Sequence, residues 1–155
     1  MEKILLLPDD AIPKANTLYC RRRQTTDGTQ LDLRQEKRLL PRIRLIDSFI
    51  SGGSFREYLM AEVSGSKEPI CLYLRRGAAG FRLPCTDGQG TELTERFTGG
   101  SYCKLMCENY LWHDQGKYDL ILYDDEDSLR EKEKIAENCG IAYLLIDSDM
   151  EKAPW

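Results

Sequence analysis

The stretch KYDLILYDDEDSLREKEKIAENCGIAYLLIDSD, residues 117–149, carries the clearest fold pattern in this chain of 155 residues. Two short apolar runs, at 118–123 and 141–146, flank a segment in which apolar residues recur at helical spacing. Ser128 followed by Glu131 matches a capping box, so the helix is expected to begin near Ser128. The stretch therefore predicts a βαβ unit in which the two strands are adjacent and parallel.

Three apolar runs, at 4–7, 120–123 and 142–146, end in clustered aspartates. The carboxyl ends of parallel strands meet at one edge of a sheet, and Mg²⁺ prefers carboxylate oxygens. This pattern predicts one alternative function, a Mg²⁺-dependent nuclease or phosphohydrolase. Aspartate also caps turns and helix starts, so ordinary capping is the leading interpretation. The candidate metal ligands are Asp9, Asp124, Asp125, Asp147 and Asp149.

The N-terminal two thirds of the chain favour short antiparallel strands. Asp27-Gly28 is a strong hairpin turn within 18–34. Gly77–Gly80 is interpreted as another turn. Further strands are expected at 42–46, 56–63, 70–75 and 81–83. We therefore expect one α+β domain over 1–155, with an antiparallel β-rich part at 17–97, a curled sheet or small barrel, and a helix plus βαβ part at 98–155.

Composition indicates an ordinary soluble globular protein, with 41% hydrophobic and 31% charged residues. The apolar runs are far shorter than a membrane span, and the run after Met1 is too short for a signal peptide. These features predict a cytoplasmic protein without a membrane partner.

Charge is unevenly distributed along the chain. Residues 19–46 hold eight Lys/Arg and three Asp/Glu, whereas residues 108–151 hold four and thirteen. Such segregation permits one basic and one acidic face. A second alternative function, nucleotide or nucleic-acid binding, would use the arginine-rich hairpin, although a pI near 5.1 is unlike that of dedicated nucleic-acid binders. Its candidate binding residues are Arg21, Arg23, Arg42 and Arg44.

The six cysteines are expected to be reduced thiols, mostly buried on apolar faces. Cys103 and Cys107 fall in a predicted helix at 102–111, whose apolar stripe explains both without a metal. Zinc held by these two residues with Cys85 and His113 is a weaker interpretation than Mg²⁺. No cofactor is expected.

No phosphate loop, dinucleotide fingerprint, zincin helix or nucleophile elbow is present in the sequence. His113 is the only histidine and lacks the partners of a catalytic triad. The leading prediction is therefore a non-catalytic cytoplasmic binding or regulatory module that acts through protein–protein contacts with an unidentified partner.

Overall fold

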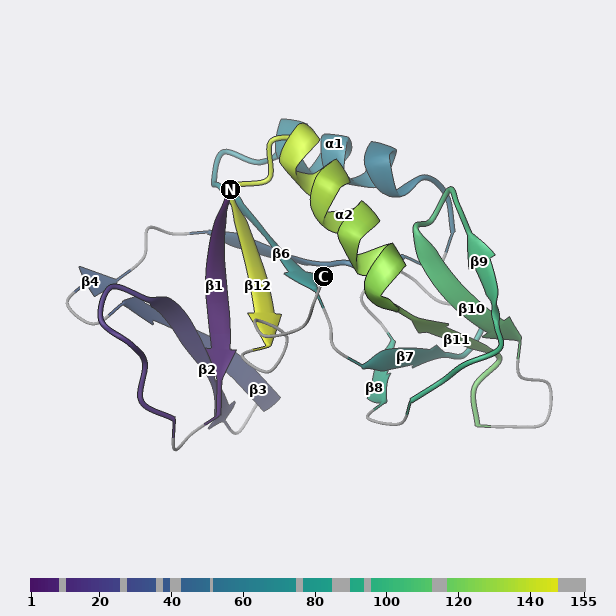
Figure 1. Cartoon of the computed structure of the whole chain (residues 1–155), viewed down its shortest axis with the longest axis horizontal. Helices are drawn as coiled ribbons and strands as arrows, with labels where there is room; N and C mark the ends of the chain where they lie inside the picture. Colours follow the sequence, from purple (N-terminus) through teal and green to yellow (C-terminus); the bar gives the residue numbers. More distant parts are fainter. Residues whose placement is uncertain are drawn as a thin grey trace.

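Figure 1 shows the computed structural model of the chain, in which two helices lie beside two β-sheets. The structure describes residues 1–8, 11–25, 28–35, 38–39, 43–50, 52–74, 77–84, 90–93, 96–112 and 117–147. For the strand residues 22–25, 28–35, 38–39 and 92 it describes the backbone and not the side chains.

The larger sheet has seven strands in the order β4-β3-β2-β1-β12-β6-β5. Five adjacent strands run parallel to one another: β2, β1, β12, β6 and β5. β3 pairs with the other edge of β2 in antiparallel register, and β4 pairs with β3 in the same way. The strand bounds are β1 Glu2–Leu7, β2 Leu18–Thr25, β3 Gly28–Gln35, β4 Arg38–Leu39, β5 Arg44–Asp47, β6 Ile70–Leu74 and β12 Tyr143–Asp147.

The smaller sheet has five antiparallel strands in the order β8-β7-β11-β10-β9. Leu120 and Leu122 of β11 pack with Phe49 on one face, while Ile121 and Tyr123 pack on the other. The strand bounds are β7 Ala78–Phe81, β8 Thr91–Leu93, β9 Ser101–Cys103, β10 Glu108–Trp112 and β11 Leu120–Tyr123.

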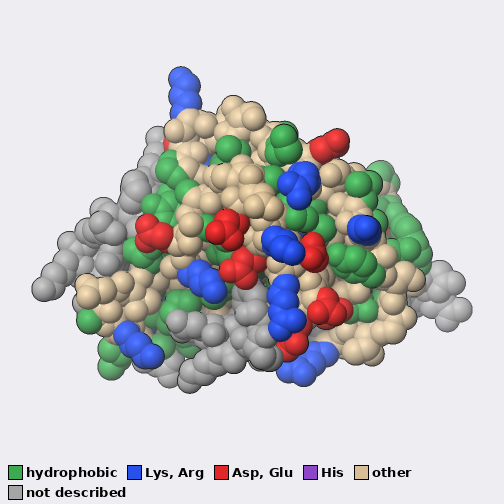
Figure 2. Space-filling view, turned by 45° about the horizontal axis from the view of Figure 1, so that its top comes forward, with side chains coloured by type: hydrophobic (Ala, Val, Ile, Leu, Met, Phe, Trp, Pro, Cys, Tyr) green, Lys and Arg blue, Asp and Glu red, His purple; other side chains and the backbone are tan. Residues whose placement is uncertain are grey.

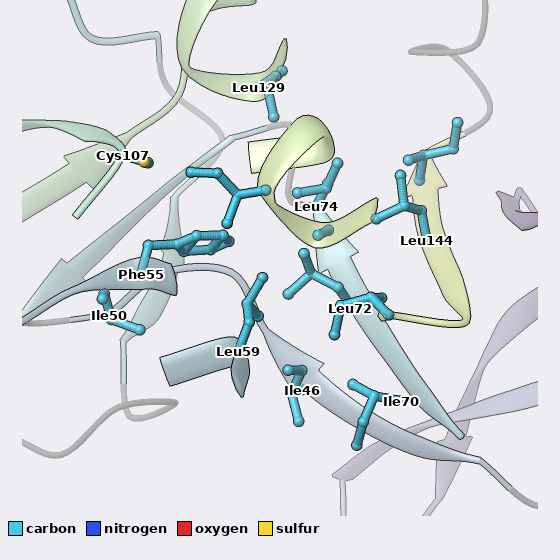
Figure 3. Close-up of a cluster of buried hydrophobic side chains, with 14 residues drawn as sticks. Ile46, Ile50, Phe55, Leu59, Ile70, Leu72, Leu74, Cys107, Leu129 and Leu144 are labelled. Atoms are coloured by element: carbon cyan, nitrogen blue, oxygen red, sulfur yellow. The ribbon is translucent and has the colours of Figure 1, made fainter. Parts of the chain in front are cut away.

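The helices α1, Phe55–Gly65, and α2, Glu126–Asn138, pack on one face of the larger sheet. Figure 3 shows the resulting core, in which Phe55 and Leu59 of α1 face Leu72 of β6 and Leu144 of β12. The opposite face is buried as well, because Leu145 is 0% exposed and packs with 0% exposed Ile4 of β1 and Cys20 of β2. Burial on both faces accounts for the apolar runs without alternation.

The predicted α+β class is wrong in its main feature, because the N-terminal part is not an antiparallel sheet or barrel. β1, β2 and β5 lie in a largely parallel sheet that also contains the C-terminal β12. Both sheets draw strands from both of the parts at 17–97 and 98–155. The hairpin at 18–34 is confirmed, since β2 pairs with β3 in antiparallel register.

The expected strand at 56–63 is a helix. Ser54 caps α1, accepting a hydrogen bond from the Glu57 N–H at 3.2 Å. Phe55 and Leu59 are buried at a spacing of four, which is helical rather than alternating. Since α1 joins the adjacent parallel strands β5 and β6, it forms a βαβ unit that the sequence analysis did not predict.

The C-terminal βαβ prediction fails in its pairing, although both strands and the helix exist. β11 lies in the smaller sheet and β12 in the larger one, so α2 connects the two sheets. α2 begins earlier than predicted because Asp125 is its N-cap and Ser128 stands at the third helical position. Each of these two side chains accepts a hydrogen bond from the other's backbone N–H, at 2.9 Å.

Two local predictions in the smaller sheet are also wrong. The predicted helix at 102–111 is a hairpin of β9 and β10, in which Tyr102 pairs with Asn109 and Cys107 adopts a φ of 55° in the turn. Gly80, interpreted as part of a turn, lies inside β7. The Tyr118 ring approaches Gly80 so closely that no Cβ atom would fit there.

Within the part of the chain that the structure describes, neither helix has the length and apolar character needed to cross a membrane.

Candidate functional site

A buried charged cluster lies where the two sheets and α2 meet. The Lys132 ammonium on α2 is 2.8 Å from Asp124 Oδ2 and 3.8 Å from Glu108 Oε1. The Lys132 and Glu108 side chains are 0% exposed and that of Asp124 is 1% exposed. Charged groups are almost never buried to this degree unless they are paired.

The local fold brings these three residues together from different elements. Glu108 opens β10 and Asp124 follows β11, which pairs directly with β10. Ser128 and Lys132 are four residues apart on α2, so both face inward. The Ser128 hydroxyl donates to Asp124 Oδ1 at 2.8 Å, which fixes the carboxylate that Lys132 binds.

Two aromatic rings lie close to the ammonium. Lys132 Nζ lies 4.5 Å from the ring centroid of Phe49 and 5.6 Å from that of Phe55. Both rings are fully buried. A desolvated cation–π contact of this kind partly replaces the hydration that the ammonium lost on folding.

The two carboxylates cannot both be fully compensated by one ammonium. Burial raises the pKa of Glu108 to about 8, against the lowering effect of Lys132. Burial also raises the pKa of Asp124, again opposed by Lys132. Because Asp124 is closer to the ammonium, we infer that it carries the negative charge and Glu108 the proton near neutral pH. Glu108 Oε1 accepts from the Ile50 N–H at 3.2 Å, while Oε2 has no partner among the described residues.

The cluster is a structural junction rather than an open reaction centre. Lys132 lies between Asp124 and Glu108, in the place where a metal ion bound to these carboxylates would sit. None of the three side chains lines either of the two hollows described below.

An acidic hollow of about 340 Å³ opens beside this cluster, between the start of α2 and the β9–β10 hairpin. We call it the acidic hollow and define it by its lining residues, Tyr102, Asn109, Asp125, Asp127 and Glu131. Asn109 and Asp125 directly follow the buried Glu108 and Asp124 in the sequence, so the hollow lies next to the buried cluster.

The electrostatics of the hollow favour ionised carboxylates. Burial opposes ionisation of Asp125, but hydrogen bonds from Ser128 outweigh it and, with a contribution from the Asn109 amide, hold the pKa of Asp125 below its ordinary value. Asp127 is 94% exposed and lies 3.9 Å from Arg130, a weak surface contact. Asp125, Asp127 and Glu131 give the hollow its acidic lining.

A second hollow, of about 430 Å³, lies across the β9–β10 turn and has the opposite character. Arg56 and Lys104 line it together with Leu105 and Cys107. Figure 2 shows that acidic and basic side chains are interspersed on this side of the molecule. The described charges on this side therefore do not form a face of a single sign.

The structure separates the predicted metal ligands. Asp124 and Asp125 follow β11 in the smaller sheet, whereas Asp147 ends β12 in the larger one, beside Leu6 of β1. Asp9 and Asp149 lie outside the described residues. Among the residues that the structure covers, no group of three His, Cys, Asp or Glu side chains is arranged to hold a metal ion.

The predicted arginine face is described only in part. Arg21 donates to the carbonyl oxygens of Pro8 at 2.7 Å and Ala11 at 2.6 Å. Arg44 pairs with Glu62 of α1 at 3.0 Å. The Arg23 side chain and all of Arg42 lie outside the description. Nucleic-acid binding by these residues stays a prediction, and the two arginines that are described already bind other parts of the chain.

The five described cysteines form no disulfide with one another. Burial and the neighbouring Cys20 raise the pKa of Cys71 to about 12. Cys107 is buried and turned inward, and Cys103 is half-buried on β9. The other two members of the zinc hypothesis, Cys85 and His113, are not described.

Thiol labelling should separate the cysteines by burial. In the native protein we expect Cys103 and Cys139 to react with a thiol reagent much faster than Cys20 and Cys71, because the thiolate is the reactive form and burial suppresses it. Mass spectrometry of peptides labelled for increasing times measures the order. Rapid labelling of Cys71 would contradict the buried position of β6.

Sequence reasoning missed the two residues that matter most in the cluster. Lys132 falls on the apolar side of the predicted helix, among Leu129, Ile135 and Ala136. A lysine in a buried stripe needs a carboxylate partner, and that requirement was the available clue. Glu108 had no such clue, because 102–111 was interpreted as a helix.

No family model matches the chain, and neither a curated protein nor a solved structure gives a significant match.

Proposed function

We propose that this chain is a non-catalytic cytoplasmic binding module that acts through protein–protein contacts made by the β9–β10 hairpin. The observation that carries the proposal is the exposure of large apolar side chains there: Tyr102 is 45% and Leu105 59% exposed, and Trp112, 65% exposed, lies on the other face of β10 from Tyr102. Aromatic side chains are enriched at protein interfaces, and exposed apolar residues on one element favour a contact site there.

The position of the hairpin supports this role. Among the described strands, β9 is one of the two edge strands of the smaller sheet, so its outer edge is available for pairing with another chain. The Leu105 carbonyl accepts a hydrogen bond from the Phe55 N–H at 2.9 Å, which ties the turn to α1. A hairpin held in place in this way loses little entropy when it binds.

The closed cluster supports the non-catalytic part of the proposal. A hydrolytic metal site needs carboxylates that can reach an ion and a substrate. Here Lys132 takes the place of the cation, and solvent does not reach Asp124 or Glu108. Neither alternative function has a comparable observation in its favour.

Site-specific crosslinking in the native host tests the proposal. A photoreactive phenylalanine analogue at Leu105 should give discrete crosslinked species, because this exposed side chain stands on the proposed contact surface. The same analogue at Lys67, exposed beyond the far end of α1, is the matched control. Equal crosslinking at both positions, or none at Leu105, would contradict the proposal, as would Mn²⁺-dependent cleavage of nucleic acid by the purified protein.

A further inference from the structure

The two hollows beside the β9–β10 hairpin adjoin on one surface. We call the second hollow the basic hollow and define it by its lining residues, Ser54, Arg56, Lys104, Leu105, Cys107 and Ile135. Glu131 lines the acidic hollow and Ile135 the basic one, and these two residues are four apart on α2, so they share one helix face. Figure 1 shows the hairpin beside both helices, so the two hollows follow one another where the hairpin meets them.

The two hollows carry charges of opposite sign that a single chain leaves unpaired. Arg56 and Lys104 of the basic hollow are exposed, and so is Glu131 of the acidic hollow. Among the described residues, none of these three takes part in an ion pair. Asp127 of the acidic hollow has only its long contact with Arg130. The surface therefore has an acidic end and a basic end, both free to meet opposite charge.

The hairpin adds exposed apolar side chains to both hollows. Tyr102 on β9 lines the acidic hollow, and Leu105 in the turn lines the basic one. About half of each side chain is exposed. Apolar and aromatic side chains flanked by charged residues are the usual composition of a protein–protein interface.

A surface with one acidic and one basic end is complementary to itself. In an isologous dimer the same patch of both copies meets, so every contact occurs twice, related by a twofold axis. With that axis passing through the hairpin, the basic end of each copy faces the acidic end of the other, and the apolar side chains meet near the axis. A different protein would have to carry the two charges in matching order, whereas a second copy carries them already.

We infer that the surface formed by the two hollows and the hairpin binds a second copy of this chain in an isologous dimer, with the basic hollow of each copy facing the acidic hollow of the other. The inference rests on the proposed function and identifies the partner. Exposed ion pairs at the ends of such an interface fix the orientation of the two copies, while the apolar centre supplies most of the affinity.

Sedimentation equilibrium of the full chain tests the inference. The wild type should form dimers as its concentration is raised, and the dissociation constant should increase with salt, because salt screens exposed charges. Leu105→Asp should weaken the dimer at least about tenfold, since it places a charge in the apolar centre. Lys67→Asp is the matched control, because Lys67 is exposed and lines neither hollow.

Reversal of charge tests the twofold arrangement. Arg56→Glu combined with Lys104→Glu makes both ends of the surface acidic, and Asp127→Lys combined with Glu131→Lys makes both ends basic. Each double variant alone should dimerise at least about tenfold more weakly than the wild type, because like charges then face each other. Glu137→Lys, an exposed change on α2 outside both hollows, should alter the dissociation constant less than about twofold.

Mixing the two reversed variants gives the most specific result. In the mixed dimer, both ends again pair opposite charges, so an equimolar mixture should dimerise much more tightly than either variant alone. Variants that had simply unfolded could not recover in this way. A mixture no tighter than its components would overturn the inference.

Other outcomes separate this inference from the proposed function. A wild type that stays monomeric at its highest soluble concentration would overturn the inference, as would a dimer insensitive to Leu105→Asp and to charge reversal. Species crosslinked at Leu105 with the mass of two copies would support both proposals. Crosslinked species of other masses alone would refute the inference and leave the proposed function standing. A charge-dependent dimer of the purified chain without crosslinking in the host would refute only the proposed function.

Discussion

Lys132→Met should lower the free energy of unfolding by about 3 to 5 kcal/mol, the largest effect we expect from any single substitution in the described core. Methionine fills much of the same volume between Phe49 and Phe55, so the loss is electrostatic rather than steric. Without the ammonium, the charged carboxylate of Asp124 stays buried beside the protonated Glu108 with no opposite charge nearby.

Urea denaturation at neutral pH measures this loss. Lys134→Met is the matched control, because Lys134 is an exposed residue of the same helix. It should change the free energy of unfolding by no more than about 0.5 kcal/mol.

A triple variant separates the charge effect from a packing effect. Lys132→Met combined with Asp124→Asn and Glu108→Gln removes the buried ion pair and the titrating carboxyl of Glu108 while nearly preserving the volume. Replacing a whole buried ionic network by neutral groups is often close to neutral for stability, so most of the loss should be recovered. A triple variant no more stable than Lys132→Met would contradict the assignment of the cost to uncompensated charge.

Sequence patterns predicted the buried strands well but not their partners. The apolar runs at 4–7, 120–123 and 141–146 all lie in or overlap strands, because burial on both faces requires continuous apolar sequence. Pairing is different, since it depends on contacts between segments far apart in the chain. Nothing in the sequence of α2 or its flanks indicates that the helix connects a strand of one sheet to a strand of the other.

Short amphipathic segments were the second source of error. The residues at 56–63 satisfy a strand pattern loosely, but Gly52-Gly53-Ser54 before them also suits a capped helix start. The residues at 102–111 show helical spacing, yet the chain reverses at Cys107. In both cases tertiary packing decides between two local alternatives.

Only the residues of the candidate site that directly precede α2 could be predicted from the sequence. Asp124 and Asp125 were identified as chemically important strand-end acids, and their observed roles are charge pairing and helix capping. Their partners, Lys132 and Glu108, depend on a fold that places β10 beside β11 under α2. The acidic hollow is a product of the same arrangement.

Glu108 makes the stability of the protein depend on pH in an unusual direction. Its pKa is about 8 in the folded protein against an ordinary value of 4.5, so the native state binds the proton more tightly than the unfolded chain. The contribution is fully present below about pH 4.5 and is lost as pH rises through about 8. We therefore expect the free energy of unfolding to fall by about 3 to 5 kcal/mol between pH 5 and pH 8.5.

Urea denaturation across this interval, on the wild type and Glu108→Gln, measures the effect. Glutamine carries no titrating proton and keeps a donor and an acceptor, so its stability should be nearly flat over the interval and should exceed that of the wild type at pH 8.5. Glu137→Gln, on the exposed face of α2, should retain the slope of the wild type. The interval lies below the pKa of the Cys71 thiol, about 12, and a residual slope in Glu108→Gln reports Asp124, whose pKa burial also raises. A wild type whose stability does not fall over this interval would show that Glu108 is ionised in the folded protein and that Lys132 neutralises both acids. A Glu108→Gln variant that falls as steeply as the wild type would show that Glu108 does not carry the pH dependence.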